Sequence, residues 1–257
     1  MLIIVIAAIL GLLIGGFNGL LIGAAMGYLA SLALQRTVIG GLNVVQGELL
    51  DTTFGVMGAL CKADSRITRD EINAVEQIFT MLRLGAEQRR KAKDAFNRGK
   101  QPGFDLDAAV DRFAAISRGR APLLQLFLQL QLMAVAADGR LDPAEHQMLV
   151  RVARRLGLTE QDVSQLEALL RAATGGPSGP GRAPPPDRLA DAYAALGITP
   201  EASPAEIKRA YRKLISQNHP DKLAARGLPE SMRAVAEERS REINAAYDLI
   251  KAARKIV

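Results

Sequence analysis

Two histidines, one cysteine and a few paired acidic residues are the side chains in this sequence that could do chemistry. His146 and His219 lie far from Cys61 and from each other in the 257-residue chain, and no second cysteine accompanies them. A structural zinc site needs four such ligands, usually at short spacing, so none is expected here. No constellation of serine, cysteine and histidine indicates nucleophilic or acid–base catalysis. The sequence therefore predicts a protein that is not an enzyme and that has no cofactor.

Four acidic residues occur in two similar stretches. Asp64 and Glu71 lie in CKADSRITRDE, and Asp138 and Glu145 lie in VAADGRLDPAE. Paired carboxylates on two related turns could hold a hard cation such as Ca²⁺. The spacing lacks the alternating ligands and the closing Glu of an EF-hand loop. The alternative, which we favour, is that these acids cap helices and solvate turns, so we predict no metal site.

The tetrapeptide HPDK, residues 219–222, follows a segment with the pattern of an amphipathic helix. Ser203 and Glu206 form a capping box, with a proline at the first helical position between them. The helix is expected to run to Asn218, where Pro220 ends it. Its core-facing stripe consists of Ile207, Ala210, Tyr211, Leu214 and Ile215. Its other faces carry Lys208, Arg209, Arg212 and Lys213.

Two further helices are expected beside this one, at about 187–196 and 229–255. A basic helix followed directly by His-Pro-Asp and then by a long helix resembles the J domain of DnaJ-family co-chaperones. The resemblance covers about residues 187–255. It implies that the chain docks on an Hsp70 chaperone of the DnaK type and stimulates its ATP hydrolysis, with no catalytic residue of its own.

The resemblance also implies which residues bind the chaperone. The basic helix would meet an acidic surface of the Hsp70, and the His-Pro-Asp turn would trigger the ATPase. The implied Hsp70-binding residues are Lys208, Tyr211, Arg212, Lys213, His219, Pro220, Asp221 and Lys222. A solvated helix face would also explain the basic residues. The net charge of +6 would suit nucleic acid, but no aromatic platform or groove-reading helix supports that partner.

The middle of the chain reads as a string of helices with an internal repeat. The two acidic stretches above align with each other, and each contains a capping box, Thr68 with Glu71 and Asp142 with Glu145. The repeated ADG…E element resembles the TerB-like domain, an all-helical module first associated with tellurite resistance, over about residues 50–172. The first copy departs from the pattern, because Ser65 stands where the second has a glycine.

The segment ATGGPSGPGRAPPPD, which begins at residue 173, separates this region from the J-like helices. Glycine, serine and proline at that density cannot build a core, so a solvated linker is expected. The chain has neither a zinc ribbon nor a Gly/Phe-rich region of the kind that general DnaJ proteins use to bind clients. Client choice would then depend on the TerB-like region and on the amino-terminal segment.

The first 35 residues contain no charged side chain, and Arg36 is the first. The run exceeds the roughly 20 apolar residues that span a bilayer. It also lacks the basic start and short apolar core of a signal peptide. We interpret it as an uncleaved transmembrane anchor; the alternatives are a cleaved signal and a buried core helix. The basic residues follow the span, which predicts cytoplasmic carboxyl-terminal domains and a periplasmic amino terminus.

Five glycines in this segment recur every fourth residue. They are Gly11, Gly15, Gly19, Gly23 and Gly27. Small residues at that spacing let two membrane helices approach closely, which predicts a homodimer through this face. The alternative is that glycine is simply frequent in membrane helices.

The order of these parts resembles the membrane-anchored DnaJ-like co-chaperones of Gram-negative bacteria. We therefore predict an all-α protein with a single transmembrane helix at 1–35, a TerB-like helical domain at 36–172, a linker at 173–186 and a J-domain helical hairpin at 187–257. The predicted function is that of a co-chaperone for a DnaK-type Hsp70 at the bacterial inner membrane. The alternative is a membrane adaptor or envelope-stress sensor that works through protein or metal binding by the TerB-like region.

Overall fold

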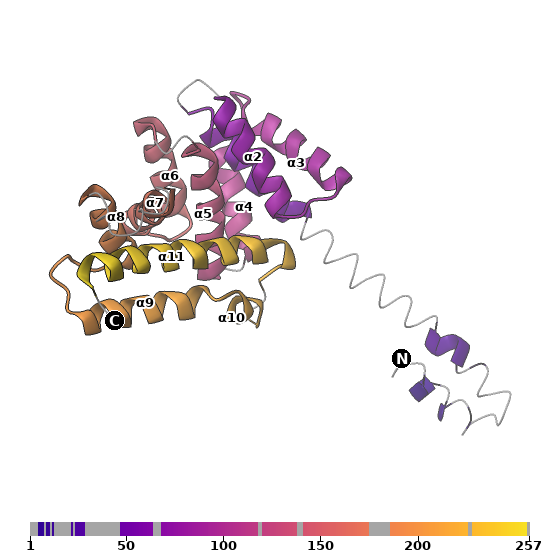
Figure 1. The fold of residues 1–257 in the computed structure, drawn as a ribbon. Coiled ribbons are helices and arrows are strands. Elements are labelled where there is room, and N and C mark those ends of the chain that lie inside the picture. The colour runs from indigo at the N-terminus through magenta and orange to yellow at the C-terminus, as the bar shows by residue number, and fades with distance from the viewer. Residues whose placement is uncertain are drawn as a thin grey trace. The chain divides into compact units, whose positions relative to one another are not determined.

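The structure of the chain is a computed structural model. The residues that it describes are 5–7, 9–10, 12, 22, 24–28, 47–63, 68–117, 120–137, 141–174, 186–225 and 228–255. They divide into two compact units, Met1–Glu48 and Leu49–Val257, and each unit is considered by itself. Every regular element among the described residues is a helix, as the sequence predicts (Figure 1).

The described residues of the first unit that precede residue 47 are all helical, and several of their apolar side chains are exposed. These side chains are Val5, Ile6, Ile9, Leu10, Leu12, Ile22, Met26 and Tyr28. Of the described residues, none forms a helix with the length and apolarity that crossing a bilayer requires. Most of the expected anchor, including Gly11, Gly15, Gly19 and Gly23, lies outside the described residues, and Gly27 is buried in the helical stretch 24–28.

The second unit begins with what we call the first bundle, residues 49–174. Its helices are residues 49–60, which continue the helix that begins at residue 47, and α2 (Arg69–Met81), α3 (Ala86–Gly99), α4 (Leu106–Ser117), α5 (Ala121–Val135), α6 (Pro143–Arg155) and α7 (Glu160–Thr174). Both predicted capping boxes are confirmed. Glu71 closes the box that starts α2, and Glu145 closes the one that starts α6. Asp64 and Asp138 lie outside the described residues, and no group of metal-ligating side chains occurs within these residues.

Helix α5 is the core of the first bundle. It carries no charged side chain, and eleven of its fifteen residues are buried. A helix that is apolar nearly all round is stable only when other elements surround it. Accordingly, α5 packs against α2, α4, α6 and α7 and also against the last helix of the chain.

The rest of the second unit, residues 186–255, forms the C-terminal bundle. Its elements are α8 (Pro186–Leu196), α9 (Pro204–Asn218), α10 (Pro220–Ala225), a 3₁₀ turn (Glu230–Met232) and α11 (Arg233–Arg254). The long helices α9 and α11 lie side by side in Figure 1, and both also contact α8. The apolar stripe predicted for α9 packs inward, since Ile207 is fully buried and Leu214 and Ile215 are half-buried against the core.

The HPDK segment differs from the sequence expectation. The predicted helix end at Asn218 is confirmed, but Pro220 also begins the short helix α10, which the sequence pattern does not predict. The residue before it, His219, is extended with φ −62° and ψ 125°, as a residue before proline prefers. Proline is favoured at a first helical position because its φ is fixed and it has no N–H to satisfy. The His-Pro-Asp turn is therefore a tight joint between two helices.

Candidate functional site

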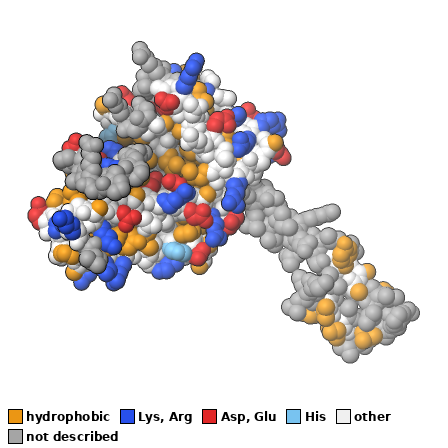
Figure 2. Space-filling view, in the orientation of Figure 1, with side chains coloured by type: hydrophobic (Ala, Val, Ile, Leu, Met, Phe, Trp, Pro, Cys, Tyr) orange, Lys and Arg blue, Asp and Glu red, His pale blue; other side chains and the backbone are white. Residues whose placement is uncertain are grey.

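The exposed basic face of α9 is the first part of the site. Ser203 caps the helix: its hydroxyl accepts the Glu206 amide at 3.3 Å, and the Glu206 carboxylate accepts the Ser203 amide at 2.7 Å. The Ser203 hydroxyl, 2.7 Å from the Glu206 carboxylate, lowers the pKa of Glu206, and the bond from the Ser203 amide lowers it further. The exposed cations on the helix are Lys208, Arg209, Arg212 and Lys213. No described carboxylate forms an ion pair with any of them, so their charge is available to a partner. Figure 2 shows Lys and Arg side chains along the lower edge of the second unit, where Figure 1 places α9.

Tyr211 holds this face in place. Its ring stacks on that of Tyr247 of α11, with centroids 4.1 Å apart and planes 13° apart. Its hydroxyl donates a hydrogen bond to Asn244 Oδ1 at 3.0 Å. Tyr211 is half-buried, so one part of its ring braces α9 against α11 while another part stays in contact with solvent.

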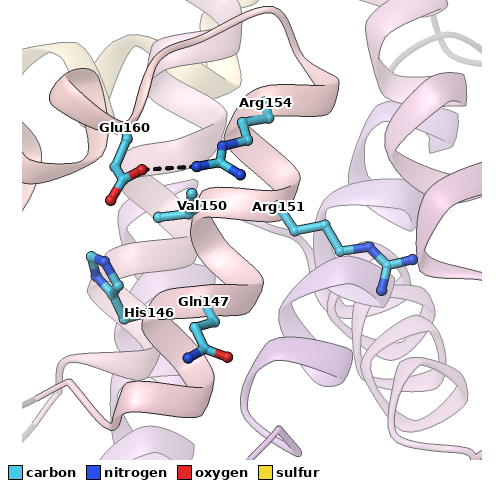
Figure 3. A pocket seen from close by; sticks show the side chains of 6 residues that line it. All are labelled: His146, Gln147, Val150, Arg151, Arg154 and Glu160. Atoms are coloured by element: carbon cyan, nitrogen blue, oxygen red, sulfur yellow. Dashed lines mark hydrogen bonds and ion pairs between the residues drawn. The ribbon is translucent and has the colours of Figure 1, made fainter.

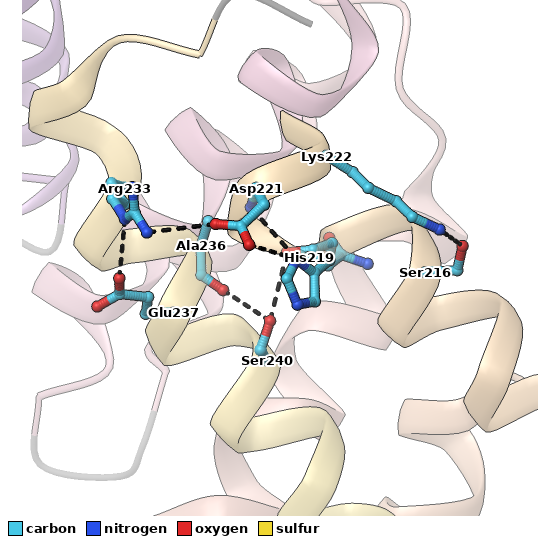
Figure 4. Close-up of polar contacts among 9 residues, drawn as sticks. Ser216, His219, Asp221, Lys222, Arg233, Ala236, Glu237 and Ser240 are labelled. Carbon is cyan, nitrogen blue, oxygen red and sulfur yellow. Dashed lines mark hydrogen bonds and ion pairs between the residues drawn. The ribbon is translucent and has the colours of Figure 1, made fainter. Parts of the chain in front are cut away.

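The His-Pro-Asp turn lies at the carboxyl end of the basic face. The Asp221 amide donates to His219 Nδ1 at 3.2 Å, and the Leu223 amide donates to the His219 carbonyl at 3.0 Å. The side chains of His219 and Asp221 are nevertheless 48% and 70% exposed. Lys222 turns back along the chain and donates to Ser216 Oγ at 2.6 Å. The turn thus presents an imidazole and a carboxylate on a rigid backbone (Figure 4).

Two residues of α11 brace this turn, and neither is among the residues predicted from the sequence. Arg233 donates to Asp221 Oδ1 and to Glu237 Oε1, each at 3.2 Å. The Ser240 hydroxyl lies 3.0 Å from the Ala236 carbonyl of its own helix and 3.3 Å from the Asn218 carbonyl, so its one proton is shared between the two (Figure 4). A signal for Arg233 existed, because it is the first residue of a helix, where the helix dipole disfavours a cation. A serine in mid-helix, in contrast, gives no such signal.

A separate hollow of about 360 Å³ lies on the first bundle, lined by His146, Gln147, Val150, Arg151, Arg154 and Glu160 (Figure 3). Its charged side chains are already paired. Arg151 bonds Asp107 at 2.7 Å, Arg154 bonds Glu160 at 2.9 Å, and His146 Nδ1 lies 2.7 Å from Glu167. With no free charge in its lining, the hollow has no feature that selects a ligand.

Comparison with known protein families gives separate matches for the first bundle and for the C-terminal bundle. Residues 51–168 match the model of the tellurite resistance protein TerB, and residues 191–256 match that of the DnaJ domain. Proteins named co-chaperone protein DjlA from Shewanella oneidensis and Photobacterium profundum are 38% and 42% identical, over 84% and 80% of this chain and 82% and 78% of theirs. The chain belongs to the DjlA family. The DjlA of Yersinia pseudotuberculosis is 37% identical over 96% of this chain and 91% of its own. No solved structure matches.

The TerB match lies in the first bundle and the DnaJ match in the C-terminal bundle, which are hereafter called the TerB domain and the J domain. All eight residues that the sequence assigns to Hsp70 binding fall within the DnaJ match. The structure brings them together on one side of the J domain, along α9 and the turn that follows it. In this chain, then, a TerB domain precedes the J domain.

Proposed function

We propose that this chain binds a DnaK-type Hsp70 through its J domain and stimulates the ATP hydrolysis of that chaperone. The observation that carries the proposal is the exposed His219–Asp221 turn directly after a helix face with unpaired cations. The name that its relatives share, co-chaperone protein DjlA, agrees with this role. The chain would act as a regulator, and the chemistry would take place in the chaperone.

The geometry suggests a division of labour within the site. The cations of α9 would steer and orient the encounter with an acidic surface, since opposite charges accelerate association and fix register. The imidazole of His219 and the carboxylate of Asp221 would then reach into the partner on a backbone that is already ordered. A preordered turn loses little conformational entropy on binding.

We further propose that the first 35 residues anchor the chain in the bacterial inner membrane, with the TerB and J domains in the cytoplasm. The support is the absence of charge before Arg36 and the exposed apolar side chains of the first unit, such as Ile6 and Met26. Large apolar side chains in water are unfavourable, whereas lipid would cover them. The four-residue glycine spacing supports a homodimer within the membrane.

The first experiment measures steady-state ATP hydrolysis by a purified DnaK-type Hsp70 after addition of the full chain in detergent. The wild type should stimulate hydrolysis, and His219→Gln should remove at least nine-tenths of the stimulation. His146→Gln is the matched control, because it changes the only other histidine, which lies in the TerB domain. Stimulation by all three proteins, or by none, would overturn the proposal.

A second variant separates this function from the adaptor alternative. Asp221→Asn keeps the shape of the turn but removes its charge. A co-chaperone should lose its cellular function with this variant, whereas an adaptor that works through the TerB domain should keep it.

The anchor and the dimer are tested in membranes. The wild-type chain should stay in the membrane fraction after alkaline carbonate extraction, and release from it would contradict the anchor. Exchange of Gly19 and Gly23 for Leu should abolish crosslinking between copies without releasing the chain. Unchanged crosslinking would exclude a glycine-mediated dimer.

A further inference from the structure

Within the second unit, the J domain packs against the TerB domain. Helix α8, which follows the linker, packs along α7, which precedes it. Three side-chain hydrogen bonds cross this contact: Gln165 to the Ala195 carbonyl at 2.9 Å, Arg188 to the Ala172 carbonyl at 3.1 Å and Arg171 to Asp191 at 2.9 Å. Helix α11 contacts α7 and α5 as well, and Figure 1 shows it between them and α9.

Three polar side chains are buried where α11 meets the TerB domain. Gln129 of α5 is 2% exposed, and Arg239 and Glu242 of α11 are each 4% exposed. Gln129 donates a hydrogen bond to Glu242 Oε2 at 2.8 Å, which joins the two domains directly. Burial lowers the pKa of Arg239, although the negative charges of Glu242 and of Asp162 on α7 stabilise its protonated form and raise the pKa by less.

The buried cluster of Gln129, Arg239 and Glu242 makes a directed hydrogen bond between the domains but leaves several of its polar atoms without a hydrogen-bond partner. Arg239 Nε, Arg239 Nη1 and Gln129 Oε1 are buried and have no hydrogen-bond partner. Burying a polar group without a hydrogen-bond partner costs free energy, and the cost is larger if the group is charged. Water would satisfy all three atoms if the domains separated. The contact therefore favours one orientation of the J domain while keeping separation energetically accessible.

The Hsp70-binding surface is not covered by this contact. The cations of α9 and the side chains of His219 and Asp221 remain exposed while α11 is packed on the TerB domain. A contact that masked the J domain would have buried these groups.

We propose that the surface formed by α5 and α7 of the TerB domain is a reversible docking site for α11 of the same chain. Docking would hold the J domain in an orientation that leaves α9 and the His-Pro-Asp turn facing solvent and so presents them to a partner. Gln129, Arg239 and Glu242 are the positioning residues of this interface. The docking itself is independent of the function proposed above, whereas the presenting role rests on it.

The test is a distance between spin labels on the two domains of the full chain. Asn97→Cys on α3 and Ala205→Cys on α9 are exposed positions, and the native Cys61 is buried and stays unlabelled. Electron–electron double resonance should give one narrow, dominant distance. Gln129→Glu places a second carboxylate against Glu242 and should broaden the distribution. Adding Glu242→Gln restores an amide–carboxylate pair with the partners exchanged, and should restore the narrow distance.

A broad distance in the wild type, a narrow one in Gln129→Glu, or no restoration by the exchanged pair would overturn the docking. If Gln129→Glu fails to fold by circular dichroism, Gln165→Glu replaces it. That side chain is half-buried, and a carboxylate there would face the Ala195 carbonyl with no proton to donate. A narrow distance in Gln165→Glu would then count against the proposal.

Hsp70 stimulation by the same proteins tests the presenting role. Gln129→Glu should reach the wild-type maximum, because the partner surface is already exposed in the docked state. A several-fold higher maximum would mean that the contact is inhibitory and would overturn presentation. If neither the wild type nor the variant stimulates Hsp70, the proposed function and the presenting role fail together, while the label distance still decides whether the domains dock.

Discussion

The side chains of the His-Pro-Asp turn are held by an ion pair, not by burial. Arg233 reaches Asp221 from the start of α11, and both side chains are exposed. Exposed ion pairs contribute only about 0.2–1 kcal/mol, so this pair can order the turn without locking it. Asp221 therefore remains able to exchange Arg233 for another cation.

Arg233→Ala should weaken Hsp70 stimulation without abolishing it. Loss of the ordering contact corresponds to a roughly 1.5- to 5-fold higher concentration of the chain at half-maximal ATPase stimulation, with an unchanged maximum. Arg241→Ala is the matched control, because Arg241 lies on the same helix and pairs with Glu238 at 2.6 Å instead of with Asp221. Equal effects of the two variants would mean that the ion pair between Arg233 and Asp221 does not contribute to Hsp70 stimulation.

Cys61 should be unreactive in the folded chain. Burial raises the pKa of its thiol, and the nearby carboxylates of Glu71 and Glu145 raise it further. The thiolate is the reactive form, so alkylation at pH 8 should be at least a hundred-fold slower than in guanidinium chloride. A maleimide assay with and without denaturant measures this ratio. Fast labelling of the folded chain would contradict the buried position of Cys61, and it would also require Cys61→Ala in the spin-label experiment.

At the scale of elements, two helices of the TerB domain touch backbone to backbone. A Cβ added to Gly58, in the helix at 47–60, would collide with the Phe96 carbonyl of α3. A Cβ added to Gly99 of α3 would likewise collide with the Gly55 carbonyl. Glycine weakens a helix by roughly 0.5–1 kcal/mol relative to alanine, so its use here is explained by the close contact.

Gly58→Ala should therefore destabilise the chain despite the better helix propensity of alanine. Overpacking against backbone atoms costs typically about 1–3 kcal/mol, which exceeds the propensity gain. Gly47→Ala is the control in the same helix, because nothing lies within 4 Å of the added Cβ, and it should be neutral or slightly stabilising. Denaturant unfolding followed by circular dichroism measures both. A stabilised Gly58→Ala would show that the two backbones are not in contact.

The elements that the sequence predicts well are those fixed by local chemistry. The boxes at Ser203, Thr68 and Asp142 mark helix starts because both partners lie within four residues. The short helix α10 was missed, because proline before an acidic residue starts a helix as readily as it ends one. The glycine contact and the bracing by Arg233 were missed because their partners lie 12 or more residues away in the chain. The position of the candidate residues along the chain could be read from the sequence; of their supports on α11, Arg233 leaves a local signal and Ser240 leaves none.

At the scale of the whole molecule, the interface between the TerB and J domains contains a titratable group. Burial raises the pKa of the Glu242 carboxyl from 4.5 to about 7, although the charge of Arg239 acts in the opposite direction. Burial also lowers the pKa of the Arg239 guanidinium to about 10, so it remains protonated at neutral pH. Helix α5 adds no charge to this interface. The other charged groups that act on the pair are Glu238, Arg241 and Asp162.

Docking of the J domain should therefore weaken as the pH rises from about 4.5 to 7. In the undocked state Glu242 faces water and regains its ordinary pKa, so the docked state binds the proton more tightly. The stabilisation is fully present below pH 4.5 and is lost as the pH passes through about 7, and it amounts to at most about 3 kcal/mol. The docked fraction in the spin-label experiment measures this directly at a series of pH values.

Glu242→Gln isolates the origin of that dependence, because other carboxylates of the chain titrate in the opposite sense. Hydrogen bonds from Arg151 and Arg155 lower the pKa values of Asp107 and Asp111, so those contacts lose stability on acidification. They lie within the TerB domain, and removing the Glu242 charge leaves them intact. The variant should thus dock to the same extent at pH 6 and pH 8, whereas Asp248→Asn, on an exposed position of α11, should keep the wild-type dependence. If the docked fraction of Glu242→Gln changed with pH as much as that of the wild type, another group would be responsible for the pH dependence. The buried Glu242 carboxyl would then not control docking.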